Sequence, residues 1–348
     1  MVRLTRCLRA LVLCLLAAGT PARAATTLKF ATLAPPGSTW MNLLEDWARE
    51  VDRKSGGRLH IHFYPGGVQG DEPDVLRKIR FGQLQGAVLT GYGIGHIYPP
   101  ARILELPFLF RDYDEIDQVR HRLLPEFERG FRQHHFELLG WLEVGFVHFF
   151  SKKRIDSLDD LKSLRIWLWQ GDPLGEAMFR AGGFSPIPLS ITEVYTSLQT
   201  GLIDTVYCTP LAAIALQWFT QVHYVSRLRM ANAIGAIVVS ERAFRRLPGD
   251  LQALLRETGR AAGERLIQAT RRDNEKSLQV LEEEGLEFVL PPETVHTANL
   301  ERMRDQALDR LMRSGYLPED LVRRTRALLA EIRAARADNT GGTAHSAR

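Results

Sequence analysis

The chain has 348 residues, of which 45% are hydrophobic and 25% charged, a size and composition that fit two globular lobes of ordinary size. Its formal net charge of +4 comes from the N-terminus, because the first 24 residues hold four of the 45 basic residues and none of the 41 acidic ones. The rest of the chain is balanced, which argues against an electrostatic surface for nucleic acid or another polyanion.

The N-terminus has the three parts of a secretory signal. Three arginines precede an apolar stretch at 10–18 that is too short to span a bilayer, and residues 22–24 have the small-x-small form of a cleavage site. We therefore expect a signal peptide over residues 1–24, cut after Ala24, and a periplasmic mature protein. The segment before Cys14 is similar to a lipoprotein signal, but Leu13 is large where a small residue is expected, so lipidation stays open as an alternative.

Cysteine usage and hydropathy give two further limits. Cys7 and Cys14 fall within the expected leader, and Cys208 stands alone in the mature chain. No intramolecular disulfide is therefore expected, and a chain of this size buries enough core without one. Beyond the leader, no apolar run in the sequence is long enough to cross a membrane as a helix.

The N-terminal third of the mature chain alternates strands with helices. The expected elements are a strand at 28–33, a helix at 38–54 with Ser38 as N-cap, a strand at 59–64, a helix at 71–81 and a strand at 86–90. Alternation at this spacing predicts a largely parallel sheet and an α/β architecture. The Gly91-x-Gly93-x-Gly95 segment lacks the spacing of a dinucleotide-binding loop and runs into two prolines, so we expect a turn there.

The middle of the chain repeats the alternation and adds two strands that cross between lobes. A helix of about 20 residues follows Leu106–Phe110, and the apolar segment 138–150 predicts a long strand and the first crossing. The second lobe has a strand at 164–169, helices near 173–182, 191–200 and 211–219, and a strand near 203–208. The apolar segment 233–240 predicts the return crossing.

The C-terminal third is mostly helical. A helical pattern of about 35 residues begins at Gly249 and would be about 50 Å long, so it could brace both lobes. A short strand at 286–290 and helices over 294–335 follow. We predict a first lobe at 25–144 and 233–275, a second lobe at 145–232 and 276–336, and a flexible tail at 337–348.

Five segments in chain order carry a family resemblance. They are Leu28–Thr32 with its Pro-Gly turn, Ser55–Arg58 followed by Phe63–Pro65, Leu106–Phe110, Asp159–Trp169, and Glu193–Asp204. Together they resemble the periplasmic solute-binding proteins of TRAP transporters, the DctP type, over roughly residues 26–320. The resemblance implies a two-lobed periplasmic binding protein fold with crossing strands and a long helix spanning both lobes. It also implies a monomer or dimer that closes on a small, usually carboxylated solute and delivers it to TRAP-type permease subunits.

Two positions depart from the family pattern. The position of Trp167 is usually an arginine that clamps a ligand carboxylate, and a second, often basic position corresponds to Val147. A buried carboxylate normally needs charge-assisted partners, and unpaired it loses several kcal/mol of solvation. Trp167 and Trp169 instead share one strand face, and each indole can remove roughly 150–250 Å² from water. We therefore predict an apolar or aromatic ligand.

The remaining pocket residues are assigned by position and chemistry. The predicted ligand-binding set is Trp167, Trp169, Val147, Phe149, Tyr92, Tyr207, Trp40, Gln170 and Asp172, with Trp218 as a further candidate. Gln170 and Asp172 would orient a polar group of a neutral or cationic ligand. Other interpretations stay open: a strand tryptophan is more often core, Asp172 suits a helix N-cap, and Arg165 would restore anion binding if it reached the cleft.

Catalytic and metal-binding motifs do not stand out. The sequence has no G-x-S-x-G, H-E-x-x-H or paired C-x-x-C, and His60 and His62 lack further metal ligands. We therefore expect no enzyme activity, no cofactor and no metal. The alternative to a TRAP receptor is a periplasmic carrier or sensor component that presents a lipid-like compound to a different partner.

Overall fold

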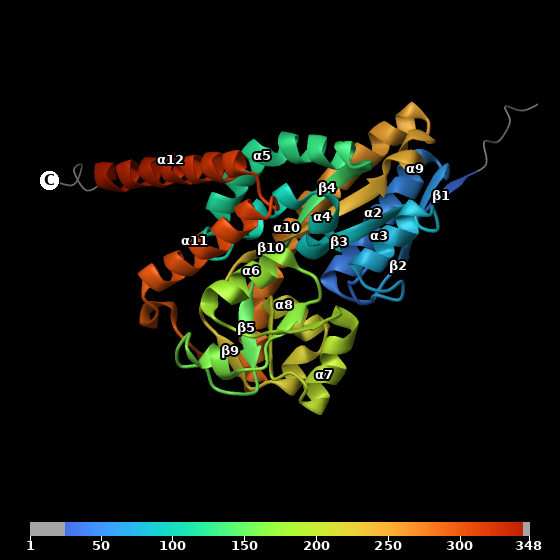
Figure 1. The fold of residues 1–348 in the computed structure, drawn as a ribbon. Coiled ribbons are helices and arrows are strands. Elements are labelled where there is room, and N and C mark those ends of the chain that lie inside the picture. The colour runs from blue at the N-terminus through green and yellow to red at the C-terminus, as the bar shows by residue number, and fades with distance from the viewer. Residues whose placement is uncertain (1–24, 344–348) are drawn as a thin grey trace, which may run out of the picture.

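The computed structural model describes residues 25–343, with side chains to residue 337, and forms two α/β lobes (Figure 1). The first lobe is built on a five-stranded sheet in the order β2-β1-β3-β10-β4. Its strands are β1 Thr26–Thr32, β2 Leu59–Tyr64, β3 Gly86–Thr90, β4 Phe136–Phe146 and β10 Asn232–Ser240. The first three strands are parallel, and β10 is antiparallel to both β3 and β4. The expected signal peptide lies outside the described residues.

The second lobe has a four-stranded sheet in the order β11-β9-β5-β8 and a two-stranded sheet of β6 and β7. The strands are β5 His148–Ser151, β6 Trp167–Trp169, β7 Ile187–Leu189, β8 Thr205–Cys208, β9 Tyr224–Ser226 and β11 Glu287–Val289. A bridge between Ile166 and Thr205 joins the two sheets side by side. Because the strand predicted at 164–169 is regular only from Trp167, Arg165 lies outside it and bonds to Asp204 through its backbone amide.

Helices cover both sheets. Those of the first lobe are α2 Thr39–Ser55, α3 Glu72–Arg80, α4 Gly91–Ile97, η1 Pro99–Glu105, α5 Tyr113–Gln133 and α9 Glu241–Arg245. Those of the second lobe are η2 Asp160–Ser163, α6 Pro173–Gly182, η3 Ile191–Glu193, α7 Val194–Thr200, α8 Pro210–Ala215, η4 Trp218–Gln221, η5 Pro292–Thr294 and α11 Thr297–Arg313. Both ends of α2 are capped by the residues that the sequence predicts. The Ser38 hydroxyl accepts a hydrogen bond from Met41 N at the start of the helix, and Gly56 ends it at φ 64°.

One local expectation is wrong. The glycine-rich segment after β3 forms the helix α4 instead of a turn. The buried Glu72 side chain explains this, because it accepts hydrogen bonds from the amides of Thr90 and Gly93 at the start of that helix. A Cβ at Gly93 would lie 2.6 Å from Glu72 Oε2, so glycine lets this turn of helix approach the carboxyl group.

Two segments connect the lobes, as the sequence predicts. The segment expected as one strand at 138–150 is β4 and β5, interrupted at Val147, and the return crossing leads into β10. The two crossings pair at this interruption: Val147 N donates to Ala231 O at 2.8 Å, and Val147 O accepts from Met230 N at 2.9 Å. A β-bulge between Ala233 and Ile234 changes the direction of β10 next to the point where the two crossings pair.

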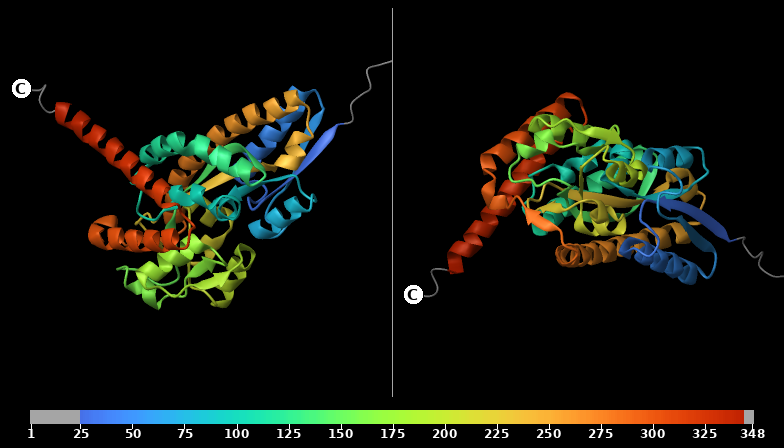
Figure 2. Two further views of the ribbon diagram at one scale, coloured as in Figure 1. Left: turned by 45° about the horizontal axis from the view of Figure 1, so that its top comes forward. Right: turned by 90° about the horizontal axis from the view of Figure 1, so that it is seen from below.

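The long helix α10, Gly249–Glu283, braces both lobes as predicted. It packs against β4 and α2 of the first lobe and against α8 of the second, and the two views of Figure 2 show it running beside α2. Glycine permits the close packing, because a Cβ at Gly263 would lie 2.5 Å from Trp141 O of β4. Farther along, Asn274 donates to Val144 O at 2.9 Å and accepts from Leu211 N at 3.0 Å, which ties the crossing strand to α8.

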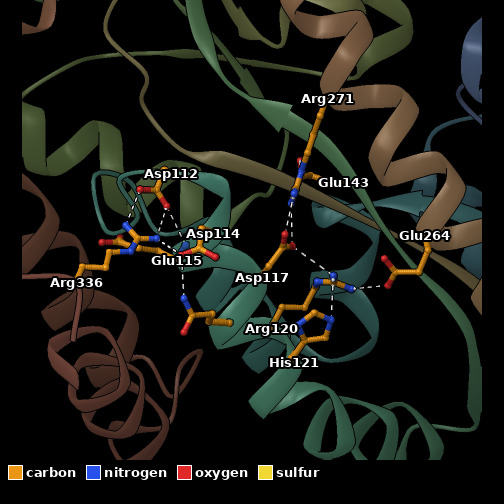
Figure 3. A network of polar contacts seen from close by, with 11 residues as sticks. Asp112, Asp114, Glu115, Asp117, Arg120, His121, Glu143, Glu264, Arg271 and Arg336 are labelled. Carbon is orange, nitrogen blue, oxygen red and sulfur yellow. Dashed lines mark hydrogen bonds and ion pairs between the residues drawn. The ribbon is translucent and has the colours of Figure 1, made fainter. Parts of the chain in front are cut away.

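A network of buried and half-buried ion pairs fixes α10 to the first lobe (Figure 3). Arg271 of α10 reaches Asp117 of α5 at 2.7 Å and Glu143 of β4 at 2.7 Å. Arg120 of α5 reaches Glu264 of α10 at 3.1 Å. Because the charges come from three elements, the network holds α5, β4 and α10 together as one rigid unit behind the cleft.

The C-terminal helix α12, Glu319–Thr343, extends away from the body of the protein (Figure 1). It packs against α5 and η1 of the first lobe, and Leu321, Leu329 and Ile332 join that lobe's core. The helix continues past residue 337, where the sequence predicts a tail. The division of the chain into lobes, which places this helix with the second lobe, stays a prediction.

Candidate functional site

A cavity of about 210 Å³ lies between the lobes, at the place where the two crossings meet. The first lobe contributes the loop from β1 into α2, the end of β3, and η1. The second lobe contributes β6, α6, the end of β8, and α8. Val144, Val147 and the segment 230–233 close the cavity at the crossings. Because every wall comes from a different part of the chain, only the folded protein assembles the site.

The second-lobe wall is aromatic. The Trp167 ring stacks on Tyr207 at 5.1 Å between centroids and meets the edge of Trp218 at 5.3 Å. Its indole N–H donates to Leu189 O at 3.1 Å, so the polar atom is satisfied by the neighbouring strand β7. Only 1% of Trp167 is exposed, so it is a core residue and a cavity-lining residue at once. We name Trp167, Tyr207 and Trp218 the aromatic wall.

Trp169 lies at the edge of the cavity and contacts the opposite lobe. Its ring stacks on Tyr92 of α4 at 4.7 Å, and its indole N–H donates to Asp71 Oδ2 at 3.0 Å. Asp71 Oδ2 also accepts from Ser190 Oγ at 2.9 Å, and Tyr92 Oη donates to Gln170 O at 2.7 Å. We call these contacts between Asp71, Tyr92, Trp169, Gln170 and Ser190 the interlobe latch, because each bond joins the two lobes.

The first-lobe wall carries buried charges. Arg102 of η1 donates through Nε to Glu105 at 2.6 Å and through a terminal nitrogen to Asp172 at 3.2 Å, and both carboxylates are buried with it. Asp172 is also the N-cap of α6, where it accepts from Leu174 N, and Glu105 accepts from Ile234 N at 2.9 Å. We call Arg102, Glu105 and Asp172 the charged triad. It has two carboxyl groups for one guanidinium.

The pKa values of the triad follow from its burial. Burial raises the pKa of the Glu105 carboxyl, while Arg102 acts in the opposite direction. Burial alone would lower the pKa of the Arg102 guanidinium, but Asp172, Tyr316 and Glu105 hold it well above its usual value. Among the described residues, Arg102 is the one cationic side chain on the cavity wall, and its nitrogens donate to Glu105, Asp172 and the Tyr316 hydroxyl. It therefore cannot clamp a ligand carboxylate without first losing a partner.

Glu72 supports the first-lobe wall from behind. It is 1% exposed, and burial raises the pKa of its carboxyl to about 8, although the amides of Thr90 and Gly93 oppose the shift. Thr90, which lines the cavity, also donates its hydroxyl to Glu72 at 2.9 Å. Glu72 therefore fixes the end of β3 and the start of α4.

Two polar side chains on the cavity wall lack hydrogen bonds. Within residues 25–337, neither amide atom of Asn232 has a partner, although the residue is 2% exposed. Tyr207 Oη also has no hydrogen bond of ordinary geometry, although the backbone of Trp169 lies near it. Buried polar atoms in proteins are nearly always paired, so these atoms mark the cavity as a place for a polar partner.

The predicted site residues divide into two groups. Those that line the cavity are Trp40, Tyr92, Val147, Trp167, Trp169, Asp172, Tyr207 and Trp218. Phe149 and Gln170 do not line it: Phe149 is buried in the second-lobe core, and Gln170 offers its backbone oxygen to Tyr92. Arg165 also lies outside, because its side chain is 52% exposed and pairs with Asp204.

Sequence reasoning did not find Arg102, Glu105, Asn232 or Asp71. One signal was present: Arg102 and Glu105 are the only Asp, Glu, Lys or Arg between Ile94 and Phe110, and an isolated charge in an apolar stretch is usually paired. Nothing in the sequence pointed to Asn232. In the described part of the chain, no helix is long and apolar enough to span a membrane, and no group of three or more potential metal ligands gathers.

Comparisons with known proteins place this geometry in a family. The family model for bacterial extracellular solute-binding protein, family 7 (DctP), matches residues 30–313. A solute-binding protein of Chromohalobacter salexigens is 30% identical over 49% of this chain, and this chain spans 51% of that protein. The sialic acid-binding periplasmic protein SiaP of Vibrio cholerae is 25% identical over 79% of this chain and 86% of that protein.

Solved structures agree on the fold. The crystal structure of a TRAP periplasmic solute-binding protein from Pseudomonas putida F1 with bound D-glucuronate superposes with a TM-score of 0.77. The match covers 87% of this chain and 97% of that one at 23% identity. The two-lobed α/β fold that the sequence predicts is confirmed. The chain belongs to the DctP family of bacterial extracellular solute-binding proteins.

Proposed function

We propose that this chain is a receptor, not an enzyme, that captures a small apolar or aromatic solute without a free carboxylate and delivers it to a TRAP-type permease. One observation carries the ligand assignment. The cavity's guanidinium, Arg102, is already bound to Asp172 and Glu105, and an indole, Trp167, lines the cavity where the sequence resemblance implies an arginine.

An anionic ligand would meet unfavourable electrostatics. To pair with the guanidinium on the cavity wall, a ligand carboxylate would have to detach Arg102 from Asp172, which would leave that buried carboxylate without its charge partner. Breaking a buried ion pair in this way costs about 3–5 kcal/mol. The cavity therefore opposes the kind of ligand that a charged clamp would favour.

An apolar ligand would gain from the aromatic wall. Trp167 is 1% exposed and Trp218 2% exposed, so the gain comes from the apolar surface of the ligand itself, which leaves water on packing against the rings at about 25 cal/mol per Å². Lost translational and rotational freedom reduces this gain. Trp167, Tyr207 and Trp218 support such packing, because the Trp167 ring contacts the other two and all three line the cavity.

The proposal separates this chain from relatives of the same fold. Two relatives have acids as ligands: SiaP of Vibrio cholerae is a sialic acid-binding protein, and the Pseudomonas putida protein holds D-glucuronate in its crystal structure. Those proteins are only 25% and 23% identical to this chain, so their ligands do not transfer with the fold. The side chains at positions 102, 167 and 172 support a different chemistry here.

Capture would proceed by closure of the lobes. The interlobe latch supports a closed arrangement, because Asp71, Tyr92 and Trp169 join the lobes at the edge of the cavity. A ligand that touches both walls binds the closed form better and shifts the equilibrium toward it. The closed form would then dock on the permease. The expected secretory signal at residues 1–24 supports a periplasmic location.

Extraction of the native protein tests this proposal. Protein purified from its own periplasm without denaturation should release a neutral apolar or aromatic compound, identified by mass spectrometry. Calorimetry with D-glucuronate and with sialic acid should give no measurable heat of binding. Submillimolar affinity for either acid, with Arg102 turned toward the acid in a crystal of the complex, would refute the ligand assignment.

A further inference from the structure

We propose that Asn232, together with Tyr207, recognises a neutral ligand group that carries a hydrogen-bond donor and an acceptor side by side, such as a carboxamide or an alcohol. This inference rests on the proposed function and deepens it. The apolar body of the ligand would lie against the aromatic wall, and its polar group would reach the crossing strands.

The unpartnered atoms of Asn232 are the first observation. Both the amide oxygen and the amide nitrogen lack a partner among the described residues, while the side chain is 2% exposed. Leaving such atoms unpaired disfavours the folded state, so a buried asparagine on a cavity wall points to a partner that binds there. An apolar residue of similar size would serve packing alone at lower cost.

The backbone around Asn232 is rigid, which is the second observation. Asn232 begins β10 opposite Phe146, and the preceding residues pair with Val147 through Ala231 O and Met230 N. The side chain is therefore held at the junction of the two crossings, where the cavity ends. A polar group fixed in this way is preorganised for a ligand.

Tyr207 supplies the third observation. Its ring lies between Trp167, stacked at 5.1 Å, and Phe179, whose centroid is 5.5 Å away. The hydroxyl is buried on the same cavity wall without a hydrogen bond of ordinary geometry. A hydroxyl both donates and accepts, so it adds a polar contact beside the indole without adding charge.

The chemistry of an amide selects the class of ligand group. A carboxylate could bond only to the Asn232 N–H and would face the amide oxygen with negative charge. An ammonium group could use only the amide oxygen. A carboxamide or an alcohol can satisfy both atoms, and the neighbouring charged triad adds no free cation to favour an acid.

Other unpartnered atoms offer a matched control. Arg120 Nε and Thr325 Oγ1 are also buried without partners among the described residues, but neither residue lines the cavity. Thr325 lies in α12, fully buried. Thr325→Val therefore removes an unpartnered polar atom of the same kind at a place where no ligand is proposed.

Four probes with one aromatic body and different ends test the inference by calorimetry: 2-phenylacetamide, 2-phenylethanol, phenylacetate and propylbenzene. In the wild-type protein the amide or the alcohol should bind about tenfold tighter than propylbenzene, the advantage that one or two neutral hydrogen bonds give. Asn232→Leu should abolish that advantage and leave propylbenzene within about twofold. Tyr207→Phe should reduce it by about threefold, and Thr325→Val should leave it unchanged.

The melting temperature separates recognition from a structural role. Asn232→Leu should keep or raise the melting temperature, because it removes unpaired buried atoms. A fall of several degrees with unchanged preference among the probes would assign Asn232 to the fold and overturn the inference. Equal affinity for propylbenzene and the polar probes would overturn it while leaving the proposed function intact. A preference for phenylacetate would instead overturn both.

Discussion

The two walls of the cavity are built on different principles. The second-lobe wall is a set of packed rings, Trp167, Tyr207 and Trp218, held by strand pairing and ring contacts. The first-lobe wall depends on buried ionisable groups, Glu72, Glu105 and Arg102, held by specific hydrogen bonds from β3, η1 and β10. The aromatic wall offers rings for a ligand to pack against, whereas the charged wall commits the one guanidinium of the described cavity lining to two carboxyl groups of the protein and leaves no free cation there for an anion.

This contrast predicts different responses to substitution. Removing a ring should leave a cavity in the core and lower the free energy of unfolding by an amount that is largely independent of pH. Removing a charge should leave its partners without a counter-charge and lower the free energy of unfolding. This loss of stability should depend on pH, because burial raises the pKa of the carboxyl groups. The substitutions below begin with the largest effect and end with the smallest.

The largest effect is expected at Trp167. Trp167→Ala should lower the free energy of unfolding by about 3–5 kcal/mol, because the ring is fully buried among other rings. Ligand binding should be lost with it. Urea denaturation measures the first effect and calorimetry on the folded fraction measures the second.

Two phenylalanine variants separate stability from binding at this position. Trp167→Phe loses the indole bond to Leu189 O, and Trp47→Phe loses the equivalent bond to Thr258 in the first-lobe core, away from the cavity. Both should lose about 1–2 kcal/mol of stability. Only Trp167→Phe should weaken ligand binding, and equal binding by the two variants would remove Trp167 from the site.

Substitution of Arg102, which contacts both carboxyl groups of the charged triad, should lower stability nearly as much. Arg102→Met leaves Glu105 and Asp172 buried without their guanidinium, which should cost about 3–5 kcal/mol of stability at neutral pH. Asp172→Asn should cost less, because asparagine remains a good N-cap for α6. Chemical denaturation checks both values. A loss below about 1 kcal/mol for Arg102→Met would mean that the triad is not desolvated.

Glu72 gives the charged wall a pH dependence. Its folded pKa of about 8 exceeds the ordinary value of 4.5, so the native state holds a proton that the unfolded state releases. The stability from this group is complete below about pH 4.5 and falls as pH rises toward 8, by at most about 1.4 kcal/mol per pH unit. Urea denaturation from pH 5 to pH 8 should show this slope in the wild type. Glu72→Gln should flatten it, and equal slopes would contradict the assignment.

The interlobe latch should show a smaller effect on closure. Asp71→Asn can keep the N-cap of α3 through its amide oxygen, but the amide NH2 then takes the place of Oδ2, so Trp169 and Ser190 lose their acceptor. Ligand affinity should fall about threefold to tenfold, equivalent to about 0.7–1.4 kcal/mol. X-ray scattering should show a larger radius of gyration at partial ligand saturation. Unchanged scattering and affinity would show that the latch does not contribute to closure.

The sequence predicted the aromatic wall better than the charged wall, for a physical reason. Strand register and helical spacing are local, so the alternation of elements, the two crossings and the strand carrying Trp167 could be found from neighbouring residues. The same reasoning did not place Phe149 and Gln170, because strand alternation does not say which face of β5 turns to the cavity or where a side chain points after β6 ends.

The charged wall depends on contacts that no local pattern encodes. Arg102 and Asp172 are hydrogen-bonded although they lie 70 residues apart in the sequence, and Asp71 and Trp169 are hydrogen-bonded although they lie 98 residues apart. These partners come from η1, from helix caps and from loops, where side-chain direction has no fixed period. Asn232 begins β10, one residue before the segment 233–240 that the sequence predicts as the return crossing, and its unpaired amide is evident only in the folded chain.

The smallest effect is expected at Arg165, the residue that would restore anion binding if it reached the cleft. It is half-exposed and bonds to Asp204, which Lys153 also contacts at 3.3 Å. Arg165→Ala should therefore change stability by less than about 1 kcal/mol, because the Arg165 side chain is half-exposed and the buried Asp204 keeps Lys153 and the backbone amide of residue 165 as partners. Affinity for the native ligand and the lack of response to D-glucuronate should both stay unchanged in calorimetry. A selective loss of binding to an acidic probe would bring Arg165 into the site, and with it a cationic contribution to the aromatic wall.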